Sequence, residues 1–144
     1  MLQVLNLASN KLIGNIPPDL FNSENLLVVN LENNLLTGPL PEFNCPSLMY
    51  LYLAVNQISG ELPESIGIAS KLIAVDLAYN EIGGRLPVAL EKMTDLEINI
   101  ESNNFMGTVS LAQISRLTLD DQFHKHQRWH PAVYAAGLLA ISAG

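Results

Sequence analysis

One apolar pattern recurs along about four-fifths of the chain and constrains its fold more than any other feature. Its clearest copy is LMYLYLAVNQISGELP, residues 48–63, where leucines alternate with other residues, an asparagine follows, and Gly-x-Leu-Pro ends the unit. Five copies carry an asparagine at the same place, and these asparagines are separated by 24, 22, 24 and 23 residues. Such a period predicts a solenoid, in which each repeat forms one coil and buries its apolar face against its neighbours.

The alternation Leu51-Tyr52-Leu53 predicts a short strand, because successive side chains of a strand point to opposite faces. Both leucines then point into the coil, and the tyrosine faces solvent. Strands of stacked coils lie about 4.8 Å apart, so the repeats predict a narrow parallel sheet along one side. The fifth copy is less regular, with Asp95 at the first leucine position and Ser110 in place of the proline.

The repeated asparagines fall where the chain leaves each predicted strand. An asparagine amide both donates and accepts hydrogen bonds, so it can pair turn backbone that would otherwise lack partners inside the coil. We therefore predict a ladder of structural asparagines: Asn10, Asn34, Asn56, Asn80 and Asn103. The repeated glycines suit a turn with positive φ or a close approach of neighbouring coils: Gly14, Gly38, Gly60, Gly84 and Gly107.

The formal charge of −7 is distributed unevenly along the 144 residues. Residues 1–115 hold 12 acidic and 4 basic side chains, whereas residues 116–144 hold 2 and 3. Nucleic-acid binding needs Lys and Arg to neutralise phosphates, so the acidic repeats disfavour a nucleic acid as partner and favour a cationic one. The single cysteine, Cys45, cannot form an intrachain disulfide, and we expect a buried thiol.

The strand alternation also identifies the side chains that face solvent on the predicted sheet. They include three tyrosines and four carboxylates, and no lysine or arginine. The candidate ligand-binding residues are Tyr50, Tyr52, Asp76, Tyr79, Glu32, Glu97 and Glu101. Tyrosine offers a large contact area at low entropic cost, and carboxylates attract a cationic ligand. The alternative is a merely solvated face, on which the tyrosines reflect strand propensity.

No constellation of residues indicates an enzyme. His124, His126 and His130 do not share one face of a helix or of a strand, and no cysteine lies nearby, so we predict no metal site. Nothing places a nucleophile or a pocket around Asp120 and Asp121, so acid–base work is not indicated there. The sequence therefore predicts no catalytic residue and no cofactor.

From Asp120 the composition changes, and no repeat residue stays in register. We predict a solenoid over residues 1–115 and a divergent tail over 116–144. A sixth strand or a short helix could include Leu117, and the pattern does not decide between them. Residues 131–144 are apolar but only 14 in number, about 21 Å as a helix, which is short of the roughly 30 Å of a bilayer core. They predict a tail or a loosely docked helix.

The form LxxLxxLxLxxNxLxGxIPxxL is nearly complete in LQVLNLASNKLIGNIPPDL, residues 2–20, and in LIAVDLAYNEIGGRLPVAL, residues 72–90. It resembles the plant-specific type of leucine-rich repeat. That type is found in the ectodomains of receptor-like kinases and receptor-like proteins, and in secreted inhibitors of cell-wall polygalacturonases. The resemblance implies a right-handed, β-dominated solenoid of the α/β class, with a short parallel sheet on the concave face and 3₁₀ or irregular structure on the convex side.

The resemblance also implies recognition of a peptide or protein on the concave face, a plasma-membrane or extracellular location, and a co-receptor as a candidate partner. The chain lacks the cysteine-paired caps, signal peptide, full transmembrane helix and kinase segment of that family, and it has no Asn-x-Ser/Thr sequon. A fragment is therefore expected. Two alternatives to a receptor module stay open: a polygalacturonase-inhibitor-like secreted protein, and a truncated product with no independent activity. The pattern indicates no oligomeric state.

Overall fold

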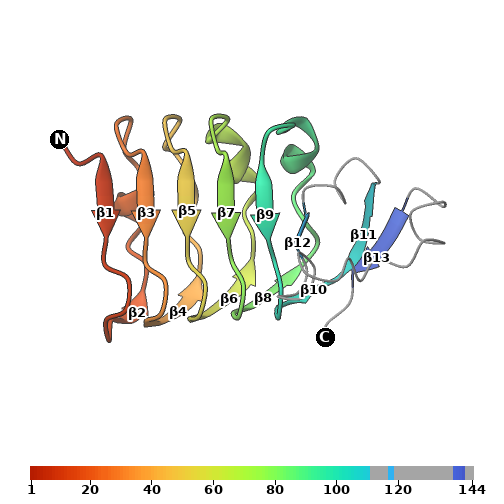
Figure 1. Cartoon of the computed structure of the whole chain (residues 1–144), viewed down its shortest axis with the longest axis horizontal. Coiled ribbons are helices and arrows are strands. Elements are labelled where there is room, and N and C mark those ends of the chain that lie inside the picture. The colour runs from red at the N-terminus through yellow and green to blue at the C-terminus, as the bar shows by residue number, and fades with distance from the viewer. Residues whose placement is uncertain (111–116, 119–137, 142–144) are drawn as a thin grey trace.

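The computed structural model describes residues 1–110, 117–118 and 138–141. Its repeats form coils that stack side by side along the long axis of the molecule (Figure 1). The solenoid predicted from the repeat is therefore confirmed. We number the coils 1 to 5 by the asparagine that each contains, which are Asn10, Asn34, Asn56, Asn80 and Asn103.

One side of the solenoid is a parallel sheet that takes one short strand from each of the five coils and a sixth from beyond coil 5. Its strand order is β1-β3-β5-β7-β9-β12. These strands are β1 (Val4–Asn6), β3 (Val28–Asn30), β5 (Tyr50–Tyr52), β7 (Ala74–Asp76), β9 (Glu97–Asn99) and β12 (Leu117–Thr118). Leu51 pairs with Val29 of the preceding coil and with Val75 of the next. Equivalent repeat positions thus lie side by side, as the predicted parallel sheet requires.

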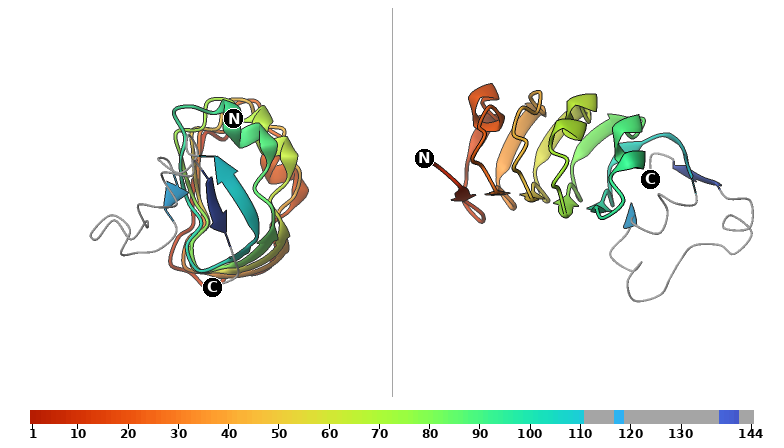
Figure 2. Two further views of the ribbon diagram at one scale, coloured as in Figure 1. Left: turned by 90° about the vertical axis from the view of Figure 1, so that its right-hand side faces the viewer. Right: turned by 90° about the horizontal axis from the view of Figure 1, so that it is seen from above.

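A second parallel sheet forms where each coil turns back. Its order is β10-β8-β6-β4-β2. The strands are β2 (Ile13–Asn15), β4 (Leu35–Pro39), β6 (Gln57–Glu61), β8 (Glu81–Gly84) and β10 (Asn104–Phe105). In the described part of the chain three coils continue into 3₁₀ helices, on the side away from the first sheet (Figure 2). These are η1 (Pro18–Phe21), η2 (Glu64–Ile68) and η3 (Val88–Lys92).

The 3₁₀ helices each begin directly after a repeat proline. The φ angles are −67° at Pro17, −65° at Pro63 and −57° at Pro87. A proline fixes φ near this value and has no N–H to donate, which suits the residue that introduces a helical turn. The irregular side predicted from the resemblance is therefore a row of proline-initiated turns.

The core is a column of apolar side chains enclosed by the coils. Leu48, Leu51 and Leu53 of coil 3 are completely buried. Phe21 and Phe43 stack between coils 1 and 2, with ring centroids 4.6 Å apart and an interplanar angle of 22°. Because apolar residues recur at every coil, the core runs the length of the solenoid and has no single centre.

The single cysteine is part of this core. Cys45 is fully buried and makes no disulfide. Burial raises the pKa of its thiol to about 11, and a bond from the backbone of Asn44 only partly offsets that effect. The thiol is therefore protonated at neutral pH, and the expected buried cysteine is confirmed.

The fifth repeat keeps its buried leucine through a shift of one residue. Leu96 is 1% exposed, whereas Asp95 is exposed. The Leu96 N–H donates to the Met93 carbonyl, as the Leu72 N–H does to the Ala69 carbonyl. The assignment of Asp95 to the leucine position is wrong, because Leu96 directly precedes β9 and turns inward in its place.

Beyond coil 5 the described residues form three more strands. Leu117–Thr118, as β12, pairs with β9 and continues the first sheet. β11 (Gly107–Ser110) pairs antiparallel with β13 (Leu138–Ile141). A tail or a loosely docked helix was expected over residues 131–144, and the helix alternative is wrong at 138–141, which form a strand. Within the described residues, no helix is long and apolar enough to cross a membrane.

The asparagine at the end of each strand bonds two successive coils. Asn80 Nδ2 donates to the Leu53 carbonyl of the preceding coil at 2.9 Å and to the Leu77 carbonyl of its own coil at 3.0 Å. Its Oδ1 accepts the Ile58 N–H at 3.0 Å. Asn34, Asn56 and Asn103 make the same set of bonds. In coil 1, Asn10 donates only to the carbonyls of Leu7 and Ala8.

Both expected features of the repeated glycines are present. Their φ angles lie between +73° and +108°, which confirms the positive φ predicted for them. A Cβ at Gly84 would lie 2.6 Å from the Glu61 Oε1 atom, and one at Gly60 would lie 3.1 Å from the Pro39 Cβ. Glu61 directly follows Gly60, and Pro39 directly follows Gly38. Each of these two glycines is thus covered by a side chain of the preceding coil.

The residue before each ladder asparagine also has a left-handed backbone, which the repeat pattern does not predict. The φ angles are +57° at Ser9, +54° at Asn33, +58° at Val55, +55° at Tyr79 and +51° at Ser102. This region costs most L-residues roughly 1–2 kcal/mol, and β-branched residues tolerate it worst, whereas asparagine tolerates it well. Val55 is therefore the least suitable of the five residues.

We expect Val55→Asn to raise the free energy of unfolding by about 1 kcal/mol, because asparagine relieves the backbone strain. Val55 is 47% exposed, so little apolar burial is lost. Urea denaturation followed by circular dichroism measures the change. Val88→Asn is the matched control, since Val88 is also exposed but lies in a right-handed helical turn. An equal gain in both variants would rule out strain at Val55.

Candidate ligand-binding face

The first sheet has a solvent side formed by the side chains that alternate with the buried ones. We call this side the sheet face; the family resemblance predicts it to be concave. Its rows cross the coils, so that Tyr50 lies between Val28 and Ala74, and Tyr52 lies between Asn30 and Asp76. The stacking of coils thus places residues 22 to 24 positions apart in the sequence beside one another.

The two tyrosines of coil 3 form a stacked pair on this face. The ring centroids of Tyr50 and Tyr52 are 6.2 Å apart, with an interplanar angle of 21°. Both side chains are half-buried, so their outer surfaces are accessible. Aromatic surfaces held in this way lose little conformational freedom when a ligand covers them.

Two carboxylates flank the tyrosine pair, and both are half-buried. Burial, followed by the negative charge of Asp76, raises the pKa of Glu32 above its usual value, and the Asn30 side chain partly lowers it. Burial also raises the pKa of Asp76, while bonds from the Ala78 N–H and from Asn99 lower it. The charge of Asp76 therefore disfavours the ionised form of Glu32, as the charge of Glu101 does for Asp76, and a cation placed between Glu32 and Asp76 would relieve part of this cost.

The phenol of Tyr52 is affected by both of these carboxylates. Burial is the largest cause of its raised pKa, and Tyr50, Glu32 and Asp76 each add to it. The effect places the Tyr52 hydroxyl within electrostatic reach of the carboxylate on each neighbouring coil. The tyrosine pair and the two carboxylates thus form one cluster on the sheet face.

The remaining predicted residues lie toward coil 5. The Tyr79 hydroxyl donates to Glu101 Oε1 at 2.6 Å. Glu101 is only 7% exposed, so its expected exposure to solvent on this face is wrong. Glu97 is exposed and pairs with Ala74, two strands away from Tyr50. The structure therefore brings Tyr79 and Glu101 together and leaves Glu97 apart from both groups.

A backbone feature of the sheet face was not predicted from the alternation. In four coils, an Asn or Asp on the face accepts the N–H of the second residue after it through Oδ1, at 3.0 to 3.1 Å. These pairs are Asn6 with Ala8, Asn30 with Glu32, Asp76 with Ala78, and Asn99 with Glu101. Coil 3 has Tyr52 at this position and lacks the bond. The departure is visible in the sequence, because the other four repeats have Asn or Asp there.

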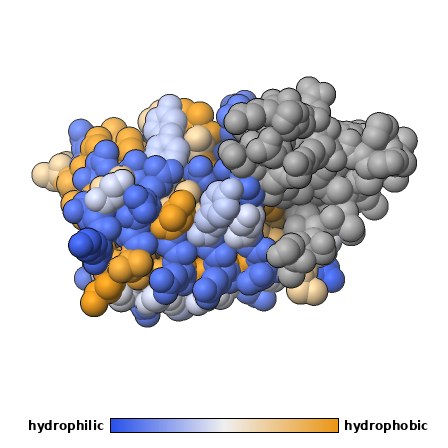
Figure 3. All heavy atoms as spheres, turned by 60° about the horizontal axis from the view of Figure 1, so that its bottom comes forward, coloured by the Kyte–Doolittle hydropathy of each residue, from blue (hydrophilic) through white to orange (hydrophobic). Residues whose placement is uncertain are grey.

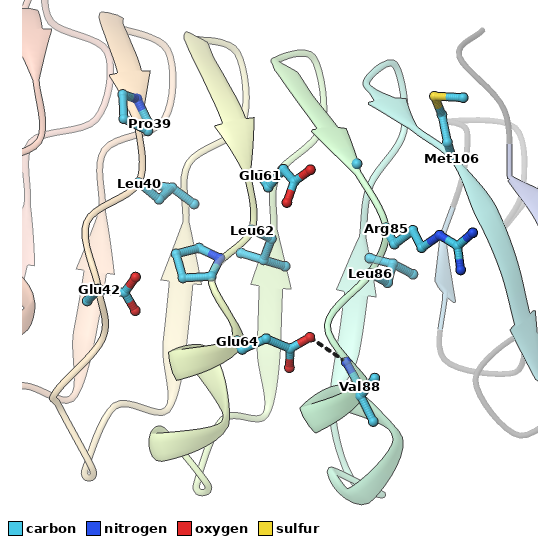
Figure 4. A pocket seen from close by; sticks show the side chains of 12 residues that line it. Pro39, Leu40, Glu42, Glu61, Leu62, Glu64, Arg85, Leu86, Val88 and Met106 are labelled. Atoms are coloured by element: carbon cyan, nitrogen blue, oxygen red, sulfur yellow. Dashed lines mark hydrogen bonds between the residues drawn. The ribbon is translucent and has the colours of Figure 1, made fainter.

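A hollow of about 780 Å³ lies away from the sheet face, where the second sheet meets the proline turns (Figure 4). Leu40 and Leu62 are among its lining residues, and Glu61 and Arg85 also line it, with Arg85 directed away from Glu61. The Glu64 carboxylate accepts the Val88 N–H at 3.1 Å, so it caps the helix of the next coil. With the bottom of Figure 1 turned forward, hydrophilic residues cover much of the visible described surface (Figure 3).

No group of three or more His, Cys, Asp or Glu side chains in the described residues could hold a metal ion. His124, His126, His130, Asp120 and Asp121 all lie outside those residues. Within the described chain, the sheet face therefore offers the best candidate site, since it combines aromatic area with unneutralised charge.

Comparison with known proteins supports the repeat assignment. The leucine-rich repeat family model matches residues 1–23 and 47–68. Comparison with curated protein sequences finds no match. Among solved structures, the ectodomain of the Arabidopsis thaliana receptor kinase GASSHO1/SCHENGEN3, in complex with CASPARIAN STRIP INTEGRITY FACTOR 2, is 30% identical with a TM-score of 0.74. That match covers 85% of this chain and 17% of the receptor chain.

Two further receptors have similar coils. The plant peptide hormone receptor RGFR1 in complex with RGF2 is 33% identical, with a TM-score of 0.70, over 77% of this chain and 18% of that one. The Arabidopsis receptor kinase HAESA, in complex with the peptide hormone IDA and the co-receptor SERK1, is 29% identical, with a TM-score of 0.67, over 69% and 17%. The chain thus spans less than a fifth of the length of these receptor structures. Its repeats match the leucine-rich repeat family model, and its coils are similar to those of plant receptor-kinase ectodomains.

Proposed function

We propose that the chain is a recognition module that binds a peptide or protein ligand on its sheet face. One observation carries the proposal: the stacked pair of Tyr50 and Tyr52 lies between two carboxylates, Glu32 and Asp76, on a solvent-facing sheet. Aromatic anchors supply contact area, and the carboxylates select a basic partner. The similar receptors that are complexed with peptide hormones support the same kind of ligand.

The family resemblance extends this proposal to location and assembly. A module of a receptor-like kinase or receptor-like protein would act outside the cell at the plasma membrane, and a co-receptor would be a second partner. In this proposal residues 1–115 carry recognition and residues 116–144 form a divergent tail. Ligand binding rather than catalysis is the activity, with no cofactor and no nucleic acid involved.

The test is binding of the full chain to three pools of synthetic peptides of equal length, which are basic, neutral and acidic. We expect the basic pool to bind most tightly, and the affinity to fall as salt rises from about 50 to 300 mM, since mobile ions screen exposed charges. Tyr50→Ala combined with Tyr52→Ala should weaken binding at least about tenfold, because the aromatic anchors are lost. Fluorescence polarisation measures the affinity.

Ser9→Ala is the matched control, because Ser9 lies on the same face in coil 1, away from the tyrosine pair. It should bind as the unmodified chain does. Unchanged binding in the double tyrosine variant, with an intact circular dichroism spectrum, would refute the proposed site. Inhibition of fungal polygalacturonase in place of peptide binding would favour the inhibitor class. A chain that self-associates and binds neither would favour a product without independent activity.

A further inference from the structure

Coil 3 differs from the other coils at one backbone donor. The N–H groups of Ala8, Glu32, Ala78 and Glu101 each donate to the Asx side chain two residues earlier. The equivalent donor in coil 3 is the Ala54 N–H, and Tyr52 precedes it. No acceptor for this N–H exists among the described residues, although Ala54 is only 7% exposed.

An N–H without an acceptor is uncommon in a residue as little exposed as Ala54, because a donor withdrawn from water normally gains a bond within the protein. An asparagine at position 52 would remove this defect, as asparagine does in coils 1, 2 and 5. The chain instead has a tyrosine that stacks on Tyr50. The Ala54 N–H is therefore available to donate to an acceptor on a ligand.

Negative charge lies on both sides of this donor. Glu32 belongs to the preceding coil, two residues after Asn30, and Asp76 of the next coil pairs directly with Tyr52. Neighbouring strands are about 4.8 Å apart, so the two carboxylates lie on coils about 10 Å apart with Tyr52 between them. A flat cation that covers the Tyr52 ring could reach both carboxylates at once.

We propose that coil 3 holds a two-point subsite for a basic residue of an extended peptide. The main-chain carbonyl oxygen of that residue accepts the Ala54 N–H. Its guanidinium group lies over the Tyr52 ring, between the carboxylates of Glu32 and Asp76. Arginine fits better than lysine, because its planar group stacks on an aromatic ring and donates to two carboxylates in fixed directions. The inference rests on the proposed function, since it assigns one residue of the proposed peptide ligand.

The test is a nuclear magnetic resonance titration of the full chain, labelled with ¹⁵N, with two capped tripeptides. One is acetyl-Gly-Arg-Gly-amide, and the other has citrulline, a neutral analogue of similar shape, in place of arginine. We expect the arginine peptide to move the Ala54 amide proton downfield and to bind at least about tenfold more tightly than the citrulline peptide, because only arginine is charged. Equal affinity for the two peptides would overturn the charge assignment.

Two variants test the subsite: Asp76→Asn removes one charge and keeps the Ala54 donor free, whereas Tyr52→Asn removes both the free donor and the stacking ring. Asp76→Asn keeps an Oδ1 acceptor for the Ala78 N–H but removes the charge, so it should lose most of the preference for arginine over citrulline. Tyr52→Asn supplies the Ala54 N–H with the acceptor used in other coils, so the Ala54 amide should no longer respond. Glu81→Gln is the control, because Glu81 is exposed on the second sheet, and it should behave as the unmodified chain does. A preference for arginine that survives Asp76→Asn and Glu32→Gln together would overturn the subsite.

Failure of the subsite is distinguishable from failure of the proposed function. If the arginine peptide shifts amides elsewhere on the sheet face, near Tyr79 or Glu97, but leaves Ala54 unchanged, the subsite is wrong and the recognition face stands. If no amide of the sheet face responds to either tripeptide or to the basic peptide pool, both are wrong.

Discussion

Replacing Asn80 by alanine is expected to lower the free energy of unfolding by about 3 kcal/mol, as estimated from the buried groups that lose their partners. The Asn80 amide accepts from the Ile58 N–H and donates to the carbonyls of Leu53 and Leu77. Alanine removes all of these bonds but leaves the backbone groups inside the coil. Urea denaturation monitored by circular dichroism gives the change.

Asn10→Ala is the matched control for this prediction. Asn10 occupies the same repeat position, but its amide donates only to the exposed carbonyls of Leu7 and Ala8. Water can replace both bonds, so the loss should stay below about 1 kcal/mol. Similar losses in the two variants would show that the bonds between coils contribute little to stability.

The second large effect is expected at the stacked phenylalanines. Phe43→Ala should lower the free energy of unfolding by about 4 kcal/mol, since it removes a buried ring and leaves a cavity beside Phe21. The backbone N–H of Phe43 would keep its bond to the Ser65 hydroxyl, so the effect reports packing alone. Thermal and urea denaturation both measure it.

Phe43→Leu serves as the control because it retains most of the apolar volume. We expect it to cost less than half as much as Phe43→Ala, about 1.5 kcal/mol, because the neighbouring side chains can close around a smaller residue. Equal costs for the two variants would mean that the ring geometry, rather than the filled volume, stabilises coils 1 and 2.

The strands of the first sheet were predictable because they depend on a periodic pattern. Leu51 and Val75 occupy the same position in successive repeats, and they therefore lie side by side in the sheet. The burial of Leu96 was not predictable from the alignment, since one residue fewer between leucine and strand changes which side chain turns inward. Regular spacing thus predicts the coil, and a departure from it is resolved only by the three-dimensional path.

The candidate site was predictable to a smaller extent. Alternation identifies Tyr50 and Tyr52 as neighbours on one face, but it does not show that Glu101 is buried and bonded to Tyr79. Nor does it show that the Ala54 N–H lacks an acceptor, because that depends on bonds which the other coils make. Local patterns give the direction of a side chain, whereas its burial and partners depend on the coils on either side.

The side chains that lie over the repeat glycines have a consequence for how such a protein can change. Asn15 lies over Gly38, Pro39 over Gly60, Glu61 over Gly84 and Arg85 over Gly107, and these four side chains share no chemistry. A glycine makes no demand on the residue above it beyond leaving it room. This edge of the solenoid can therefore acquire a new charge or shape, one coil at a time, while the core beneath it stays the same. Substitutions of these side chains could therefore change which partner binds along this edge without changing the fold.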